Sequence, residues 1–238
     1  RALGPVGPRL NLAPAPLPVD ASGDAKAEDW RSFGALADAA FDAIAPAVAY
    51  NRIANEYLVV WQGDDNVGGL VDNEFEVFSQ RLDADLGGLG SNDYRLSDAG
   101  GVGDASFQVL WGPAVAFNPA INRYLVTWSG EDSVDGMVKG EWEVFAQLLT
   151  ADIQGRGPND ERISDAGGLG SALYLVYSPV VAANPANGQF LVAWGGEDNI
   201  GGLVDNEEEI FIQRMDGMAI FIDGFEVGDT SNWSSRTP

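Results

Sequence analysis

The sequence contains no cysteine and no histidine, and basic residues are few. Without cysteine, the chain can form no disulfide, thiolate metal site or thiol nucleophile. Without histidine, a Ser-His-Asp triad, a His-ligated zinc and an imidazole acid–base step are excluded. Thirteen basic against 36 acidic residues give a formal net charge of −23, which repels nucleic acid and anionic membrane surfaces. No apolar run approaches the roughly 18 residues of a membrane helix, so no membrane insertion is expected.

The composition is that of a folded protein. Of the 238 residues, 45 % are hydrophobic and 10 % aromatic, which is enough for a core and too much for a disordered chain. The length suits one or two domains. Because the chain begins with Arg1 rather than methionine, we expect a processed form whose targeting segment has been removed.

An internal repeat is the strongest pattern in the chain. The segment Pro-Ala-Val-Ala-Tyr-Asn at 46–51 recurs as Pro-Ala-Val-Ala-Phe-Asn at 113–118 and as Pro-Val-Val-Ala-Ala-Asn at 179–184, with offsets of 67 and 66 residues. Aligned without gaps, residues 46–83 and 179–216 are identical at 22 of 38 positions. The chain therefore contains duplicated structural units.

Each unit has the pattern of four short strands. In the first unit they are expected at residues 47–50, 57–61, 75–82 and 93–96, where β-branched and aromatic residues alternate with Gly, Asn and Asp clusters. This pattern, without a long 3.6-residue period, predicts an all-β protein made of three repeats of a four-stranded antiparallel sheet.

The phase of the repeat suggests how the last sheet is completed. The third unit ends near residue 217 without a fourth strand, whereas Glu-Asp-Trp-Arg at 28–31 resembles the fourth-strand segments at 92–95 and 159–162. We expect the N-terminal segment to complete the last sheet, which removes an exposed strand edge. The predicted β-domain spans residues 20–217, and its three units span about 28–83, 92–150 and 159–217.

Units of this size resemble propeller blades, yet propellers typically have four or more blades. Three arrangements remain: a three-fold β-prism-like trimer of sheets, two chains forming a six-bladed ring, or open sheets completed by neighbouring molecules. The sequence favours one pseudo-symmetric domain of three sheets.

Two segments lie outside the repeats. Residues 1–19 contain five prolines and predict an extended arm, about 60 Å long at roughly 3.1 Å per residue. This arm could reach a second molecule, and residues 218–238 form a tail whose apolar start resembles one more strand. The arm residues expected to mediate assembly are Leu3, Pro5, Val6, Pro8, Leu10, Leu12, Pro14, Pro16, Leu17 and Pro18.

The turn between the second and third strands is acidic and glycine-rich in all three units. Carboxylates on such a loop supply the hard oxygen ligands that Ca²⁺ prefers, although solvated acidic turns have the same composition. Candidate Ca²⁺ ligands are Asp64, Asp65, Asp72, Glu74, Asp132, Asp135, Glu141, Asp198, Asp205 and Glu207. The second loop is the weakest of the three sites, because Lys139 replaces the acid of the other two.

Several other side chains recur once per unit. Trp61, Trp128 and Trp194 could form a sugar-stacking platform, but large aromatic residues on strands more often belong to the core, and so do their partners Phe78, Phe145 and Phe211. We expect Gln80, Gln147 and Gln213 to be buried amides or an exposed strand face, and Arg95 and Arg162, with Arg31, to form one salt bridge per unit.

Paired carboxylates could hydrolyse glycosides. The pairs are Glu74/Glu76, Glu141/Glu143 and Glu207/Glu209. A catalytic centre normally breaks repeat symmetry, whereas these pairs are kept in every unit. We therefore expect no enzyme, with a structural or ion-binding role for the acids and a carboxylate-based glycosidase as a low-ranked alternative.

The strand pattern Tyr-Leu-Val-Val-Trp at 57–61 followed by Glu-Val-Phe-Ser-Gln-Arg-Leu at 76–82 resembles repeats of exported bacterial proteins with propeller-like β-sheets. The ending at 221–234 resembles a C-terminal tail of secreted proteins of Gram-negative bacteria. The resemblance implies a secreted protein, extracellular or on the cell surface, and defines no substrate.

These observations lead to an expected function. The leading hypothesis is an extracellular structural protein that self-assembles into a filament or surface layer through its N-terminal arm, with itself as partner. The alternative is a calcium-dependent glycan- or protein-binding adhesion module, with Ca²⁺ as its cofactor.

Overall fold

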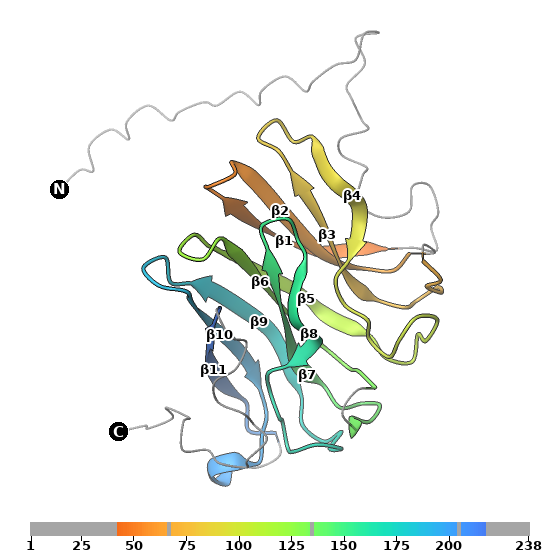
Figure 1. Ribbon diagram of the computed structural model, residues 1–238. Helices are drawn as coiled ribbons and strands as arrows, with labels where there is room; N and C mark the ends of the chain where they lie inside the picture. Colours follow the sequence, from red (N-terminus) through yellow and green to blue (C-terminus); the bar gives the residue numbers. More distant parts are fainter. Residues whose placement is uncertain (1–41, 66–67, 134–135, 204–205, 218–238) are drawn as a thin grey trace, which may run out of the picture.

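Three antiparallel sheets make up the part of the chain that the computed structural model describes, namely residues 42–65, 68–133, 136–203 and 206–217. The sheets contain four, four and three strands in chain order (Figure 1). The first sheet is β1 (Ala43–Asn51), β2 (Glu56–Gly63), β3 (Glu76–Leu82) and β4 (Gly88–Arg95). The second is β5 (Val109–Asn118), β6 (Arg123–Gly130), β7 (Glu143–Thr150) and β8 (Gly155–Arg162). The third is β9 (Val176–Ala183), β10 (Gln189–Gly196) and β11 (Glu209–Asp216), with a short 3-10 turn at Ile200–Gly202.

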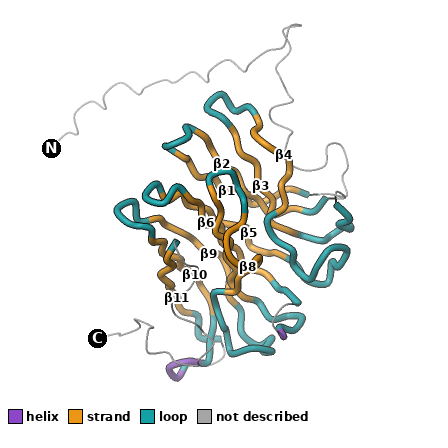
Figure 2. The backbone as a smooth tube through the Cα atoms, viewed as in Figure 1, coloured by secondary structure: helices purple, strands orange, loops and turns teal. Residues whose placement is uncertain are grey.

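Each sheet is a meander in which every strand pairs with the next strand along the chain. The apolar and aromatic runs form the central strands, and the Gly, Asn and Asp clusters form the turns (Figure 2). In each unit the tryptophan of the second strand lies opposite the phenylalanine of the third, as in the pair Trp61 and Phe78. The predicted all-β fold of three repeated sheets is confirmed.

The sheets follow one another like the blades of a propeller. The first strand of each sheet lies on the inner side, so that β5 contacts both β1 and β9 (Figure 1). In addition, β5 lies against β2 of the preceding sheet, and β9 lies against β6. This packing places the starts of the inner strands close together.

Two cores fill the spaces between the sheets. Side chains alternate between the two faces of each strand. We call the face that packs on the following sheet the back face; in the first two sheets it carries Leu58 and Leu125. The opposite face, which packs on the preceding sheet, is the front face and carries Tyr124 and Phe190 in the second and third sheets.

The recurring aromatic residues are core, as expected. Trp61, Trp128 and Trp194 are at most 3 % exposed, and each stacks on the phenylalanine opposite at a centroid distance of 6.1 or 6.2 Å. They lie on the front faces and bury large apolar areas there. A sugar cannot reach these indoles.

Some predictions fall outside the described residues. These are the N-terminal strand at 28–31, the proline-rich arm at 1–19 with all its assembly residues, and the tail at 218–238. The third sheet therefore has three described strands, in the order β11-β10-β9. No helix in the described part of the chain is long and apolar enough to cross a membrane.

Candidate functional site

The acidic loops bind backbone amides of the segments that connect the sheets. Glu74 accepts hydrogen bonds from the amide of Val71, in its own loop, at 2.9 Å and from Gly103, in the connection to the second sheet, at 2.9 Å. Glu141 repeats this in the next unit, with the amides of Val138 at 2.9 Å and Gly170 at 3.0 Å. Both carboxylates are almost completely buried.

A second acid holds each connecting segment from the other side. Asp132 accepts the amide of Gly100 at 3.0 Å, and Asp198 accepts the amide of Gly167 at 3.1 Å. A Cβ atom at Gly100 would lie 2.7 Å from the ring of Phe107, so this approach requires glycine. Each connection is thus fixed between an acid of the sheet that it leaves and an acid of the sheet that it enters.

These contacts change the interpretation of the candidate calcium ligands. Asp64 accepts the amides of Asp42 and Asn73 at 2.6 and 2.9 Å. Asp65 is buried, Asp72 and Glu207 are exposed, and Asp135 and Asp205 lie outside the described residues. Within the described ranges, no group of three or more acids is arranged to hold a metal ion. The loop acids that are brought together serve backbone amides instead.

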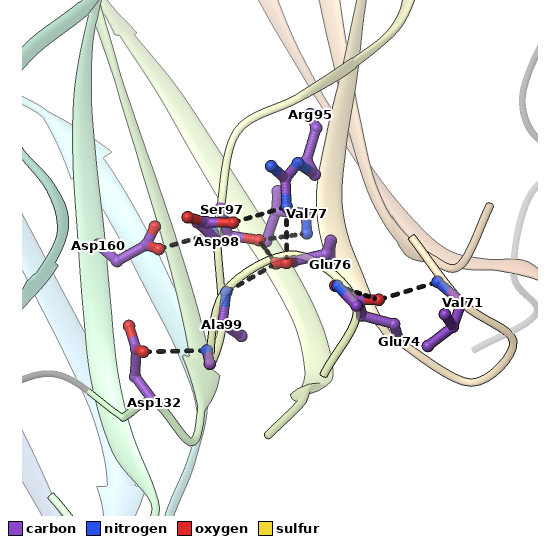
Figure 3. Close-up of polar contacts among 12 residues, drawn as sticks. Val71, Glu74, Glu76, Val77, Arg95, Ser97, Asp98, Ala99, Asp132 and Asp160 are labelled. Atoms are coloured by element: carbon purple, nitrogen blue, oxygen red, sulfur yellow. Dashed lines mark hydrogen bonds and ion pairs between the residues drawn. The ribbon is translucent and has the colours of Figure 1, made fainter. Parts of the chain in front are cut away.

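The second carboxylate of each pair is enclosed in the first two sheets. Glu76 accepts hydrogen bonds from the Ser97 hydroxyl and from the amide of Ala99 at 3.2 Å, and it forms an ion pair with Arg95 at 3.2 Å (Figure 3). Burial raises the pKa of Glu76 to about 7, against the lowering effects of Ser97, Ala99 and Arg95. This glutamate has no access to solvent.

Glu143 repeats the arrangement in the second sheet. Its partners are the Ser164 hydroxyl, the amide of Ala166 at 2.9 Å and Arg162 at 3.4 Å. Burial raises its pKa to about 7 as well. The predicted salt bridge per unit is therefore present for Arg95 and Arg162, and each arginine also pairs with an aspartate three residues later.

Asp160 extends the acidic cluster between the first two sheets. Its carboxylate accepts the amide of Asp98 at 2.6 Å (Figure 3). Burial, with the nearby charges of Glu76 and Asp132 as smaller contributions, raises the pKa of Asp160 to about 8. Like Glu76, it is buried and accepts a backbone amide of the connection.

The recurring glutamines contribute to the same sheets. The side-chain amides of Gln80 and Gln147 are buried and donate to backbone carbonyls of the third and fourth strands, for example from Gln80 to Leu89 at 3.1 Å. They tie adjacent strands within one sheet. They therefore offer no binding surface.

A different group of side chains is accessible, at the junction of the second and third sheets. Trp111 of β5 lies against Trp142, which directly precedes β7, with ring centroids 5.0 Å apart and an edge-on angle of 65°. Trp111 also contacts Tyr177 of β9, at 6.0 Å. Trp111 is 44 % exposed, and the other two rings are half-buried. We call these three rings the aromatic cluster.

The backbone presents Trp111 to solvent at some conformational cost. Trp111 has φ +59°, which is uncommon for a bulky residue, and it lies in a β-bulge between Leu110 and Ala114. The next residue, Gly112, donates its amide to Gln62 of the first sheet at 3.1 Å. A Cβ atom there would lie 2.6 Å from that of Ala45, so glycine is required. The bulge itself recurs in the other sheets, where Ala45 in β1 and Ser178 in β9 have φ +49° and +51°.

Two acids lie beside the aromatic cluster. Hydrogen bonding to Glu208 raises the pKa of the Tyr177 hydroxyl, and burial and the charges of Glu208 and Glu197 add to this rise. Glu208 is exposed and Glu197 is half-buried. The site thus combines accessible aromatic rings with carboxylate acceptors at one end.

Sequence analysis missed this cluster because its members are not repeated. Trp111 and Tyr177 occupy the position of Ile44, and Trp142 and Glu208 occupy the position of Phe75. Searching for recurring residues selects the core. The signal that could have revealed the cluster is variation between the units, because its two positions carry a different residue in each of the three units.

Comparisons with known proteins bring no family assignment. No family model matches the chain, and no curated protein matches it. Among solved structures, an N-acetylgalactosamine deacetylase from F. plautii, in complex with blood group B trisaccharide, is 11 % identical with a TM-score of 0.44, covering 77 % of this chain and 52 % of its own. A thermostable family-43 glycoside hydrolase is 15 % identical with a TM-score of 0.39, covering 74 % and 54 %. A further glycoside hydrolase is 14 % identical with a TM-score of 0.40, covering 76 % and 55 %.

The chain therefore spans about half the length of the solved structures that it matches. These structures are carbohydrate-active enzymes by their names, and none of the three is a filament or an adhesion protein. Against this finding, the prediction of a filament or surface layer assembled through the N-terminal arm is wrong. The calcium-dependent adhesion module gains no support either.

Proposed function

We propose that the protein binds a neutral saccharide chain at the aromatic cluster. The observation that carries this proposal is the exposed ring of Trp111, held at positive φ against Trp142 and Tyr177. The C–H faces of a sugar ring pack on aromatic rings, while its hydroxyls donate hydrogen bonds to carboxylates such as Glu208 and Glu197. Binding sites commonly combine aromatic walls with a few polar groups.

Charge and packing narrow the ligand class. A net charge of −23 disfavours anionic ligands, which selects neutral over acidic saccharides. An aromatic cage for a quaternary ammonium ion would need space between its rings. Here the centroid of the Trp111 ring lies 5.0 Å from that of Trp142 and 6.0 Å from that of Tyr177. This spacing leaves no room for a ligand between the rings, so a ligand can lie only against their outer faces.

We propose binding rather than hydrolysis. Glycoside hydrolysis requires two carboxyl groups that reach the scissile bond. Glu74 and Glu76 are fully buried, as are Glu141 and Glu143, and all four accept backbone or side-chain hydrogen bonds of the sheet connections. These four carboxylates therefore serve the fold. Glu207 and Glu209, the third pair, are exposed, and no described part of the chain encloses them in a cleft with a second pair.

Replacing Trp111 with alanine tests the proposal. The full chain is titrated with a panel of soluble neutral polysaccharides of hexose and pentose units, and binding is followed by calorimetry. We expect at least one polymer to bind, and Trp111→Ala to weaken it about tenfold or more, because a lost stacking surface is worth about 1.4 kcal/mol or more. Ile44→Ala is the matched control, since Ile44 is the exposed equivalent in the first sheet.

Three results would contradict the proposal. These are failure of every neutral polymer to bind, equal binding by the Trp111→Ala variant, or binding of choline at this cluster without binding of any saccharide. Near-ultraviolet circular dichroism of the variants checks that the fold is kept.

A further inference from the structure

The two ends of the row of sheets expose faces that are buried at the internal junctions. On the back face of the third sheet, Leu191 is 47 %, Ile210 74 % and Ile212 57 % exposed. The equivalent residues of the second sheet are Leu125, Val144 and Ala146, and none of these is more than 1 % exposed. The third sheet thus carries an apolar back face of the same kind, without a following sheet among the described residues.

The first sheet shows the complementary feature on its front face. Val48 is 62 % and Tyr50 47 % exposed. Their equivalents in the second sheet, Val115 and Phe117, pack into the core against the first sheet. The neighbouring front-face residues behave alike: Tyr57 and Val59 are half-buried, whereas the corresponding Tyr124 and Val126 are completely buried.

We propose that the back face of the third sheet packs on the front face of the first sheet of a second copy of this chain. At both internal junctions a back face is covered by a front face, and the described chain has one uncovered face of each kind. Contiguous exposed apolar residues of this type mark interaction sites. When the back face of each copy covers the front face of the other, the two copies share two identical interfaces and the assembly is closed as a pair.

This pairing does not depend on the proposed saccharide binding. The rings of the aromatic cluster come from β5, β9 and the start of β7, and Tyr177 lies over Gly195, the cross-strand partner of Ile210, so the cluster borders the back face of the third sheet. Val48 belongs to the first sheet, and Val48→Lys therefore tests the pairing without replacing a residue next to the cluster. A protein that pairs but binds no saccharide, or the reverse, would therefore separate the two proposals.

The test measures the mass of the full chain by sedimentation equilibrium. A monomer has 25.2 kDa, and we expect twice this mass at micromolar concentration in 0.3 M NaCl. Lower salt should shift the equilibrium toward monomers, because each copy carries a net charge of −23 and screening weakens with the longer Debye length.

Variants locate the interface. Ile210→Lys combined with Ile212→Lys should give monomers, and Val48→Lys alone should do the same from the opposite face. Leu173→Lys is the matched control, because Leu173 is 75 % exposed and belongs to neither end face. All replaced residues are exposed, so the fold should persist, and circular dichroism checks this.

The proposal is overturned by a wild-type protein that remains monomeric at 200 µM, including the case in which residues 1–41 or 218–238 cover the end faces. It is also overturned if the lysine variants pair as the wild type does, or if Leu173→Lys dissociates the pair equally.

Discussion

Glu141→Ala is expected to lower the free energy of unfolding by about 3 kcal/mol or more. The side chain is 1 % exposed and accepts the amides of Val138 and Gly170 at 2.9 and 3.0 Å. Its removal leaves two amides without an acceptor, at about 1–3 kcal/mol each, and adds a cavity. The connection from the second to the third sheet loses its anchor, and the unfolding midpoint in urea should fall accordingly.

Glu207→Ala is the matched control for this prediction. Glu207 occupies the same position in the third unit but is exposed, so its replacement should change stability by less than about 1 kcal/mol. Both variants are measured with and without EDTA. Equal stability losses for the two variants, or a loss in Glu141→Ala that is present only when calcium is available, would argue against a structural role for Glu141.

The second large effect concerns pH, and we expect the protein to be more stable near pH 5.5 than near pH 8.5. Burial raises the pKa values of Glu76 and Glu143 to about 7 and that of Asp160 to about 8. In the unfolded chain these groups have ordinary values near 4. Between about pH 4 and pH 8 the folded protein therefore binds more protons than the unfolded chain, and the free energy of unfolding falls as the pH rises through this range.

For a carboxyl group whose folded-state pKa is about 7, the loss of stability from pH 5.5 to pH 8.5 is about 2 kcal/mol, because only the range from 5.5 to about 7 contributes. Glu76→Gln and Glu143→Gln should each flatten the pH profile by an amount of that order, because the amide cannot ionise. Glu209→Gln is the control. Glu209 is the equivalent residue in β11 and is exposed, so this substitution removes one negative charge from the surface and not from a buried position. Urea unfolding at both pH values measures this, and a protein that gains stability from pH 5.5 to 8.5 would refute the assignment.

The sheets were predictable because a strand repeats a short-range pattern. Alternating apolar residues and Gly, Asn and Asp turns are local, so the strand segment 57–61 and the observed β2 nearly coincide. The burial of the recurring tryptophans was predictable for the same local reason, because a large aromatic side chain on the apolar face of a strand is buried by the packing of that face. These residues are Trp61, Trp128 and Trp194.

The role of the acids was not predictable from their loop alone. Glu74 and Glu141 have the composition of calcium ligands, and only the fold reveals that amides 29 residues later occupy the space in front of them. Contacts across such a distance depend on how the connecting segment returns to the sheet. The aromatic cluster is of the same kind, because Trp111 and Tyr177 come from different sheets.

The most direct test of the proposed function follows the indole N–H signals of the seven tryptophans by ¹⁵N–¹H correlation spectroscopy, during titration with the bound polysaccharide. We predict that the signals of Trp111 and Trp142 shift with saturation, while those of the buried Trp61, Trp128 and Trp194 stay in place. Saturable shifts confined to other tryptophans, with Trp111 and Trp142 unchanged, would contradict saccharide binding at this cluster.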